Sequence, residues 1–353
     1  MALDIFKETT QQKILDEVRL QSALVSILAH GYDIDSWAAL QELADSGQAS
    51  RFISIGDQMP GTWTDVEANT TYNAPWDVVD FRQITTPGGE KKNAIIMQMH
   101  YCTPYDMQFD APEQVEADEA TAQDGVYYYG YDGSAYSLLT LQTGDTIPYS
   151  NYTKVFKNSI LDTTSNIVRY GYNRWRDSGM RQYLNSAERK NLWWTSTHLG
   201  DVAPSQLTTK AGFMSGLPSD MLAVVNPIAV TTALNTVTDG GTSTGSVDVT
   251  HDKFWEPSIE EMYGVPQLAD VEGPYYSYWK AATGLDAPNN AANDGRTIYD
   301  MGATTTARIV RLRSAYRSYS GYVWYCSNSG TLGYYGATNA YRCAPACAIY
   351  KPS

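Results

Sequence analysis

The sequence predicts an α+β protein in which an N-terminal helical segment precedes short strands, small antiparallel sheets and short helices. Two patterns carry this prediction. Between Thr10 and Ala29, apolar residues recur at helical spacing, at Ile14, Val18, Leu24, Ile27 and Leu28. From Arg51 onward, short apolar or alternating runs are separated by Gly, Pro and Asn turns.

Residues 1–50 are predicted to be a docking or oligomerisation segment. A second helix, expected over 34–43, follows the turn His30-Gly31 and ends near Gly47. Two helices of this size cannot bury their apolar faces alone. They must pack on the body of the protein, on copies of themselves or on a larger assembly.

Residues 51–353 are predicted to form one ligand-binding domain that contains a β-rich insertion. Strands are expected at 52–55, 78–81 and 93–101. After the acidic residues Glu113 to Glu119, runs at 127–131, 135–141 and 147–149 predict an antiparallel insertion at about 111–157, with a turn at Asp132-Gly133. Short helices are expected to begin at 177–178, at 218–219 and at Pro257, the last ending at Gly264.

Charge and hydropathy exclude several classes of protein. The formal net charge of −14 disfavours nucleic-acid binding, which needs a basic surface to displace counterions from phosphates. No Asp or Glu follows Asp300, so we expect the arginines beyond it to pair with upstream carboxylates, with an anionic partner as the alternative. No signal peptide is recognisable, and no segment has the ~20 apolar residues of a membrane span.

The residues that carry common catalytic and metal chemistry are sparse. Four cysteines at irregular spacing indicate reduced thiols, and no two of the four histidines lie at the spacing of a zinc-binding helix. Gly241 to Gly245 matches a hydrolase elbow, but within a low-complexity loop. The loop from Asp286 to Asp294 lacks the register of an EF-hand. We therefore expect no catalytic residue, metal or cofactor, and a structural calcium has no supporting motif.

The C-terminal window at about 313–343 has the composition of a binding surface. Tyr and Trp are spaced through Ser, Gly and Asn, the mixture that antibody paratopes use for contact and adaptable hydrogen bonding. A Tyr-rich edge of an ordinary fold is the alternative. The predicted contact residues are Tyr316, Arg317, Tyr319, Tyr322, Trp324, Tyr325, Asn328, Tyr334, Tyr335, Asn339 and Tyr341.

Several short segments occur in an order that resembles a known family. They include Asn173-Arg174-Trp175, Trp193-Trp194, Leu217-Pro218, Phe254-Trp255-Glu256-Pro257-Ser258, Arg311-Leu312-Arg313-Ser314 and Ala344-Pro345-Ala346-Cys347. This order is similar to a bacterial and phage domain family with a C-type-lectin-like fold, which includes the variable proteins of diversity-generating retroelements. The resemblance covers 51–353, and its closing Ala-Pro-Ala-Cys segment is the most specific part.

The resemblance implies that the window is diversified by miscopying of template adenines. The Tyr, Ser, Asn and Arg positions would then vary, over buried supports at Val323, Gly330, Leu332, Ala337 and Pro345. Ala315 stands where relatives commonly have Pro, and Cys343 where Gly or Val is usual. The calcium and sugar motifs of animal lectins are missing, so the fold name does not imply sugar binding.

The function that these features predict is non-enzymatic ligand binding. We expect a phage tail receptor-binding protein, assembled in the host cytoplasm and carried on the virion, that recognises a bacterial surface protein or glycan. Its N-terminal helices would contact other virion proteins or form a homo-oligomer, for example a trimer, because multivalency strengthens weak binding. The alternative is a bacterial, non-virion diversified protein with a cytosolic or surface partner. An enzyme of the formylglycine-generating type would need reactive thiols at Cys343 and Cys347.

Overall fold

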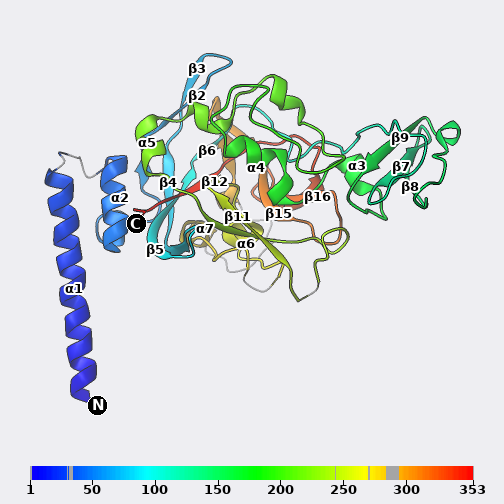
Figure 1. Ribbon diagram of the computed structural model, residues 1–353. Coiled ribbons are helices and arrows are strands. Elements are labelled where there is room, and N and C mark those ends of the chain that lie inside the picture. Colours follow the sequence, from blue (N-terminus) through cyan, green and yellow to red (C-terminus); the bar gives the residue numbers. More distant parts are fainter. Residues whose placement is uncertain are drawn as a thin grey trace.

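The computed structural model describes residues 2–29, 31, 35–242, 244–268, 271–283 and 294–352. Figure 1 shows a body of small sheets and short helices, with a long helix at one end and a β-rich lobe at the other. The protein is mixed α+β, and its sheets are small and predominantly antiparallel, as the sequence predicts.

The central sheet has five strands, all paired antiparallel, in the order β1-β4-β5-β18-β12. Their bounds are Gln58–Met59 (β1), Trp76–Thr85 (β4), Lys91–Met99 (β5), Ala346–Ile349 (β18) and Phe254–Trp255 (β12). β18 lies between β5 and β12, and all of its residues are buried. The last strand of the chain is therefore an interior strand of the core.

Smaller sheets surround this one. β2 (Thr62–Asp65) pairs with β3 (Thr70–Asn73), and β10 (Ile228–Ala233) with β11 (Val247–Asp252). β6 (Tyr101–Cys102), β13 (Ile298–Asp300) and β14 (Ala303–Arg308) form a sheet in which β6 and β13 are parallel. β15 (Val310–Ala315), β16 (Tyr322–Cys326) and β17 (Leu332–Gly336) form another, and β8 (Tyr136–Leu139), β7 (Tyr127–Tyr131) and β9 (Lys154–Asn158) a third.

The helices are mostly short. The α-helices are Ala2–Ala29 (α1), Trp37–Ser46 (α2), Asn166–Tyr170 (α3), Gly179–Leu184 (α4), Ser219–Val224 (α5), Ile259–Tyr263 (α6) and Ser277–Thr283 (α7). The 3₁₀ turns are Ala49–Arg51, Tyr149–Asn151, Trp175–Asp177, Ser205–Thr208, Phe213–Gly216 and Asp294–Arg296. α6 begins at a capping box between Ser258 and Glu261 and ends at Gly264, whose φ of 66° is left-handed. Among the described residues, no helix combines the length and apolar run that a bilayer crossing requires.

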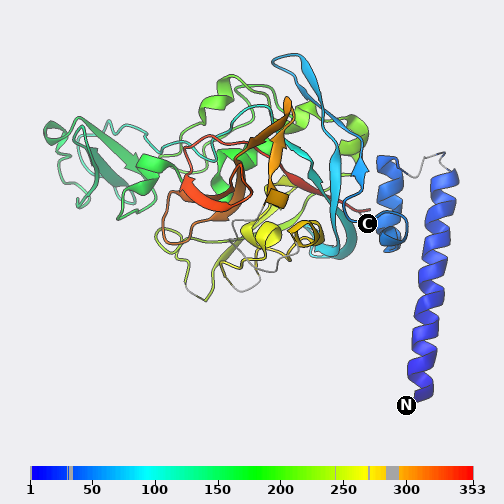
Figure 2. The same cartoon turned by 180° about the vertical axis from the view of Figure 1, so that it is seen from behind.

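The N-terminal segment is more extended than predicted. α1 starts at Ala2 rather than near Thr10. Leu20, Ala23 and Ile27 are buried on the side of α1 that meets α2, while the rest of α1 projects from the body (Figures 1 and 2). α2 begins at the N-cap Ser36, and Ile34, where this helix was predicted to start, lies outside the described residues.

Two predicted strands are wrong. Residues 52–55 form turns, because the amides of Phe52 and Ile53 bond to the carbonyl of Ala49 and the amide of Ser54 to Asp57. Residues 147 and 148 precede the 3₁₀ turn Tyr149–Asn151, and Pro148 has no amide hydrogen to donate to a neighbouring strand. Some elements were not predicted from the sequence, among them α3, α7, β2, β3, β9 and β10. Ser243 and residues 286–293, considered above as part of an elbow and a calcium loop, lie outside the described residues.

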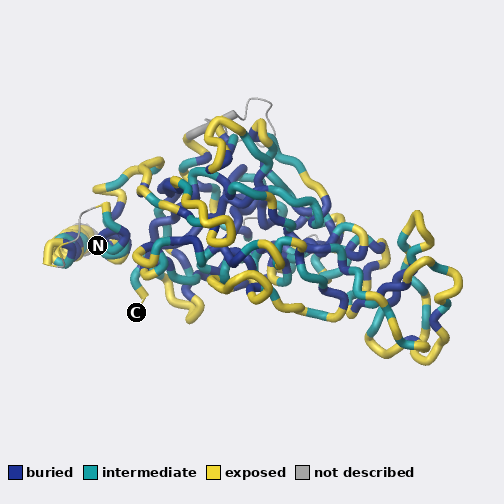
Figure 3. Tube along the Cα trace, turned by 90° about the horizontal axis from the view of Figure 1, so that it is seen from above, coloured by how far each residue is buried: buried dark blue, intermediate teal, exposed yellow. Residues whose placement is uncertain are grey.

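The insertion forms a lobe with its own small cores. β7 occupies the predicted range, and β9 rather than 147–149 supplies the third strand. Tyr129 and Phe156 anchor one apolar cluster, and Tyr128 and Val155 another on the opposite side of the sheet. Figure 3 shows this lobe and α1 as the most exposed parts of the chain, on either side of the buried body.

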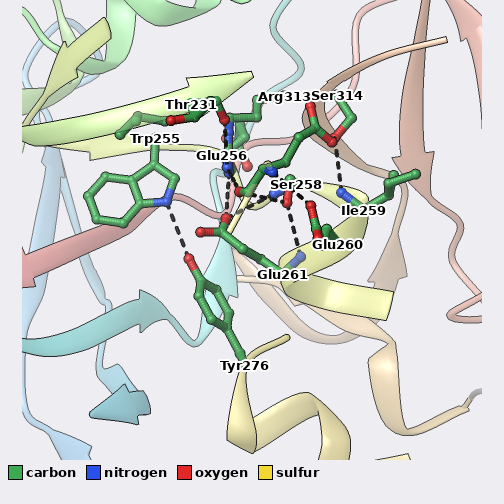
Figure 4. Close-up of polar contacts among 12 residues, drawn as sticks. Thr231, Trp255, Glu256, Ser258, Ile259, Glu260, Glu261, Tyr276, Arg313 and Ser314 are labelled. Carbon is green, nitrogen blue, oxygen red and sulfur yellow. Dashed lines mark hydrogen bonds and ion pairs between the residues drawn. The ribbon is translucent and has the colours of Figure 1, made fainter. Parts of the chain in front are cut away.

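A buried ion cluster joins α6 to β15. The Arg313 guanidinium pairs with Glu261 and donates to the carbonyls of Glu256 at 3.1 Å and Thr231 at 3.2 Å (Figure 4). Arg82 also bonds to Glu261, at 3.0 Å. Burial opposes ionisation of Glu261, but the charges of Arg313 and Arg82 outweigh it and lower the pKa of the carboxyl. Arg313 therefore belongs to the core and not to a binding face, contrary to the predicted start of the window.

Replacing Arg313 should destabilise the whole domain. Arg313→Met leaves buried carboxylates without one of their cations, which costs roughly 3–5 kcal/mol of unfolding free energy. The control is Arg308→Met, because Arg308 is partly exposed and Asp300, its partner at 2.9 Å, keeps Arg342. That control should lose less than about 1 kcal/mol. Urea unfolding of both variants measures the difference, and equal losses would contradict the assignment of Arg313 to the core.

Candidate aromatic binding face

The candidate face is built on the sheet β15-β16-β17. β15 is buried along its whole length and supplies the foundation. β16 is the central strand, and its Trp324 pairs with Tyr334 of β17 while Val323 pairs with Tyr335. Because side chains alternate along a strand, Trp324 and Tyr334 share one side of this sheet, and Val323 and Tyr325 lie on the other.

Six aromatic side chains from β16, β17 and the 316–319 turn form a continuous cluster, called here the tyrosine ladder. Its members are Tyr316, Tyr319, Tyr322, Trp324, Tyr334 and Tyr335. The rings of Tyr316 and Tyr334 stack with centroids 3.9 Å apart, and those of Tyr319 and Tyr322 with centroids 4.9 Å apart. Tyr319, Tyr334 and Tyr335 remain 41%, 41% and 52% exposed.

A second aromatic pair, Tyr325 with Tyr341, lies on the side of the sheet opposite Trp324 and Tyr334. The rings of Tyr325 and Tyr341 are 5.3 Å apart, and the Arg311 guanidinium lies 4.5 Å from the Tyr341 centroid. A Cβ at Gly333 would meet the outer end of the Tyr325 ring, so a side chain there requires that ring to move. Both tyrosines are half-buried. The structure thus brings together the predicted aromatic residues, in two groups.

Arg311 holds the face from beneath through backbone carbonyls. The guanidinium is fully buried and donates to the carbonyls of Val323 (3.2 Å), Gly336 (3.0 Å) and Asn339 (2.6 Å). Burial lowers the pKa of Arg311 to about 10. One side chain thereby ties β15 to β16, β17 and the turn after them.

Asn173 performs a similar task at the other edge of the ladder. Its buried amide donates to the carbonyl of Tyr319 at 2.5 Å and of Tyr322 at 2.9 Å. Asn235 in turn donates to the Asn173 side-chain oxygen at 2.9 Å. Asn173 was not among the residues predicted to form or support the face. An isolated Asn carries no local signal for a contact almost 150 positions away.

The predicted supports are mostly buried. Val323 and Ala337 are completely inaccessible, Gly330 and Pro345 are buried, and Leu332 is half-buried against the core. Gly330 has a φ of 74°, which favours glycine, and its carbonyl accepts from the Tyr263 hydroxyl at 2.9 Å.

The three polar contact residues have different positions. Asn328 is exposed in the turn after β16, and Asn339 is half-buried. Arg317 bonds inward: its guanidinium donates to the carbonyls of Leu234 at 2.8 Å, Gln267 at 3.3 Å and Thr242. These bonds position a neighbouring loop. That the half-buried Arg317 also supplies hydrogen bonds to a ligand stays a prediction.

The charges around the face are largely internal. Arg308 and Arg342 pair with Asp300 at 2.9 and 3.2 Å, as expected for arginines near upstream carboxylates. Arg311 and Arg317 instead bond to carbonyls. The face therefore presents rings, hydroxyls and amides rather than free ions.

The four thiols are buried and none is in a disulfide. Burial raises the pKa of Cys343 and Cys347 well above the usual value, which lowers their thiolate fraction and disfavours reactive-thiol chemistry. Within the described ranges, no three His, Cys, Asp or Glu side chains come together to hold a metal ion.

Glu256, under the face, should make stability depend on pH. It is fully buried, its carboxylate accepts from the Ala344 amide at 3.3 Å, and burial raises its pKa from 4.5 to about 8. A raised pKa means that the folded state holds the proton more tightly. The stabilising contribution is complete below pH 4.5 and is lost as the pH rises through about 8.

Glu256→Gln removes this titration while keeping size and an acceptor oxygen. The unfolding free energy of the variant relative to wild type should rise by about 1.4 kcal/mol per pH unit between about pH 5 and pH 8. Urea unfolding across that range measures it. A difference that stays constant with pH would show that Glu256 is not held protonated.

Most of the predicted ligand-binding domain, residues 51–353, matches a known family model. Residues 150–351 match the model of a family described as "Domain of unknown function (DUF6273)". No curated protein and no solved structure matches the chain. The matched segment contains β9 through β18, and so includes Asn173, Arg311 and the whole tyrosine ladder. Because the match covers more than half of the sequence, this chain belongs to the DUF6273 family.

Proposed function

We propose that the protein is a non-enzymatic binding protein whose contact surface is the tyrosine ladder together with Tyr325 and Tyr341. The observation that carries this proposal is the ladder itself, six contiguous rings that stay partly exposed above a buried frame. Isolated surface aromatics are ordinary, but a contiguous set is typical of an interaction site.

The arrangement of the rings suits recognition. Each tyrosine has few rotors, and stacking against its neighbours fixes it before a ligand arrives, so little conformational entropy is lost on binding. In the stacked pairs Tyr316 with Tyr334 and Tyr319 with Tyr322, much of the ring faces is occupied. Ring edges, hydroxyls and the exposed Asn328 amide are then available for hydrogen bonds.

The proposed setting is a phage tail, where the face would bind a bacterial surface receptor. The C-type-lectin-like fold and retroelement diversification remain part of this proposal. Support comes from the separation of roles in the window, since Val323 and Ala337 are inaccessible while Tyr319, Tyr334 and Tyr335 are exposed. A face of this kind can change its side chains over a constant frame.

The proposal predicts that the ladder, and not the rest of the surface, captures bacteria. Tyr334→Ser with Tyr335→Ser should remove binding of the labelled protein to cells of a strain that the wild type binds, measured by flow cytometry across a strain panel. The control is Tyr299→Ser, because Tyr299 is 40% exposed on β13, which belongs to a different sheet from the ladder. Both variants should keep the wild-type melting temperature.

Two outcomes would count against the proposal. Unchanged capture by the double variant would place recognition elsewhere. Absence of cell binding combined with specific capture of a cytosolic protein by the ladder would favour the bacterial, non-virion alternative. For diversification, the gene should lie near a reverse transcriptase and a near-copy of the coding sequence for 313–342 that differs at adenines.

A further inference from the structure

The exposed side of α1 carries a heptad seam. Its positions are Ile14, Val18, Gln21, Val25 and Leu28, which alternate in spacing between four and three residues. That spacing is the repeat of a coiled coil, with Val18 and Val25 at a and Ile14, Gln21 and Leu28 at d. A helix that packs only on its own body needs no such regular second stripe.

The seam is distinct from the side of α1 that is already packed. Leu20, Ala23 and Ile27 are buried toward α2. In contrast, Ile14, Val18, Val25 and Leu28 are 59%, 56%, 64% and 77% exposed. Four β-branched or leucine side chains in one row on a projecting helix are costly to leave in water.

We propose that α1 joins copies of this chain in a parallel, in-register coiled coil through this seam. Gln21 indicates that the helix packed against this seam is a second copy of α1. A polar side chain at a core position can pair with its own copy when the helices are parallel and in register, whereas against an unrelated apolar helix it would be buried without a partner.

The charges beside the seam permit self-pairing. The flanking e and g positions in this stretch are Leu15, Ser22, Glu17 and Leu24. Glu17 is the one charged residue among these four, and its carboxylate pairs with Arg51 at 3.2 Å. Copies of α1 can therefore approach without opposing like charges along the contact.

The available area favours more than two helices. Burying one Val, Leu or Ile side chain removes on the order of 100 Å² from water, so the seam and Leu15 offer roughly 300 Å² per copy. Homodimer interfaces are about 65% apolar, so two copies that each bury this apolar area would together bury roughly 900 Å² of surface. Specific interfaces start near ~1,000 Å². A third helix adds a second contact to each copy, and Leu15 and Leu24 widen the apolar face for it.

The test is the mass of the full chain in solution. Sedimentation velocity should show two or three copies per particle, increasing with concentration, and Val18→Glu with Val25→Glu should give a monomer. The control pair Gln12→Glu with Arg19→Gln makes the same change in net charge at exposed positions off the seam, and should keep the oligomer. Circular dichroism and the melting temperature check that both variants fold.

Orientation is tested with a cysteine. The native thiols are buried, so Leu28→Cys adds an accessible one at a d position. Parallel, in-register helices bring two copies of residue 28 together, and mild oxidation should yield a disulfide-linked dimer on a non-reducing gel. A monomeric wild type, or an oligomer that survives the two glutamates, would overturn the proposal. So would the absence of cross-linking. None of these results depends on what the tyrosine ladder binds.

Discussion

The structure depends on the return of the chain end to the core. β18 is paired on both sides, with β5 and β12, and every residue in it is buried. β15, which precedes the tyrosine ladder, is equally buried. The segment between these strands, residues 316–345, is therefore held at both ends by the hydrophobic core. Such a segment can carry an exposed aromatic surface, because the strands on either side and inaccessible residues such as Val323 and Ala337 supply the burial.

Local patterns allowed much of the fold to be predicted. β7 and the helix between Ser258 and Gly264 follow from alternation and from capping residues, both of which act within a few positions. The prediction fails where local hydrogen bonds compete with the pattern. The apolar residues at 52–55 would suit a strand, but a turn uses their amides.

The candidate site shows the same limit. Composition identified the aromatic positions, because ring content needs no knowledge of the fold. It could not show that Arg313 is buried or that Arg317 bonds inward, since the partners Glu261 and Leu234 are remote in the sequence. The same holds for Arg311 and Asn173, whose roles exist only after β15, β16 and the 173 region have met.

The hydrogen bonds from Arg311 and Asn173 end on main-chain carbonyls, and this has a consequence for how the face can evolve. Every amino acid has the same main-chain carbonyl oxygen, so these hydrogen bonds do not depend on which side chain occupies position 319, 322 or 339. Substitution at these positions changes the outer surface while the inner attachment is preserved. A restriction remains at Gly330, which needs its left-handed φ, whereas a side chain at Gly333 requires only that the Tyr325 ring move. The side chains of a surface attached in this way can change, and with them the ligands that it binds, while the backbone keeps its shape.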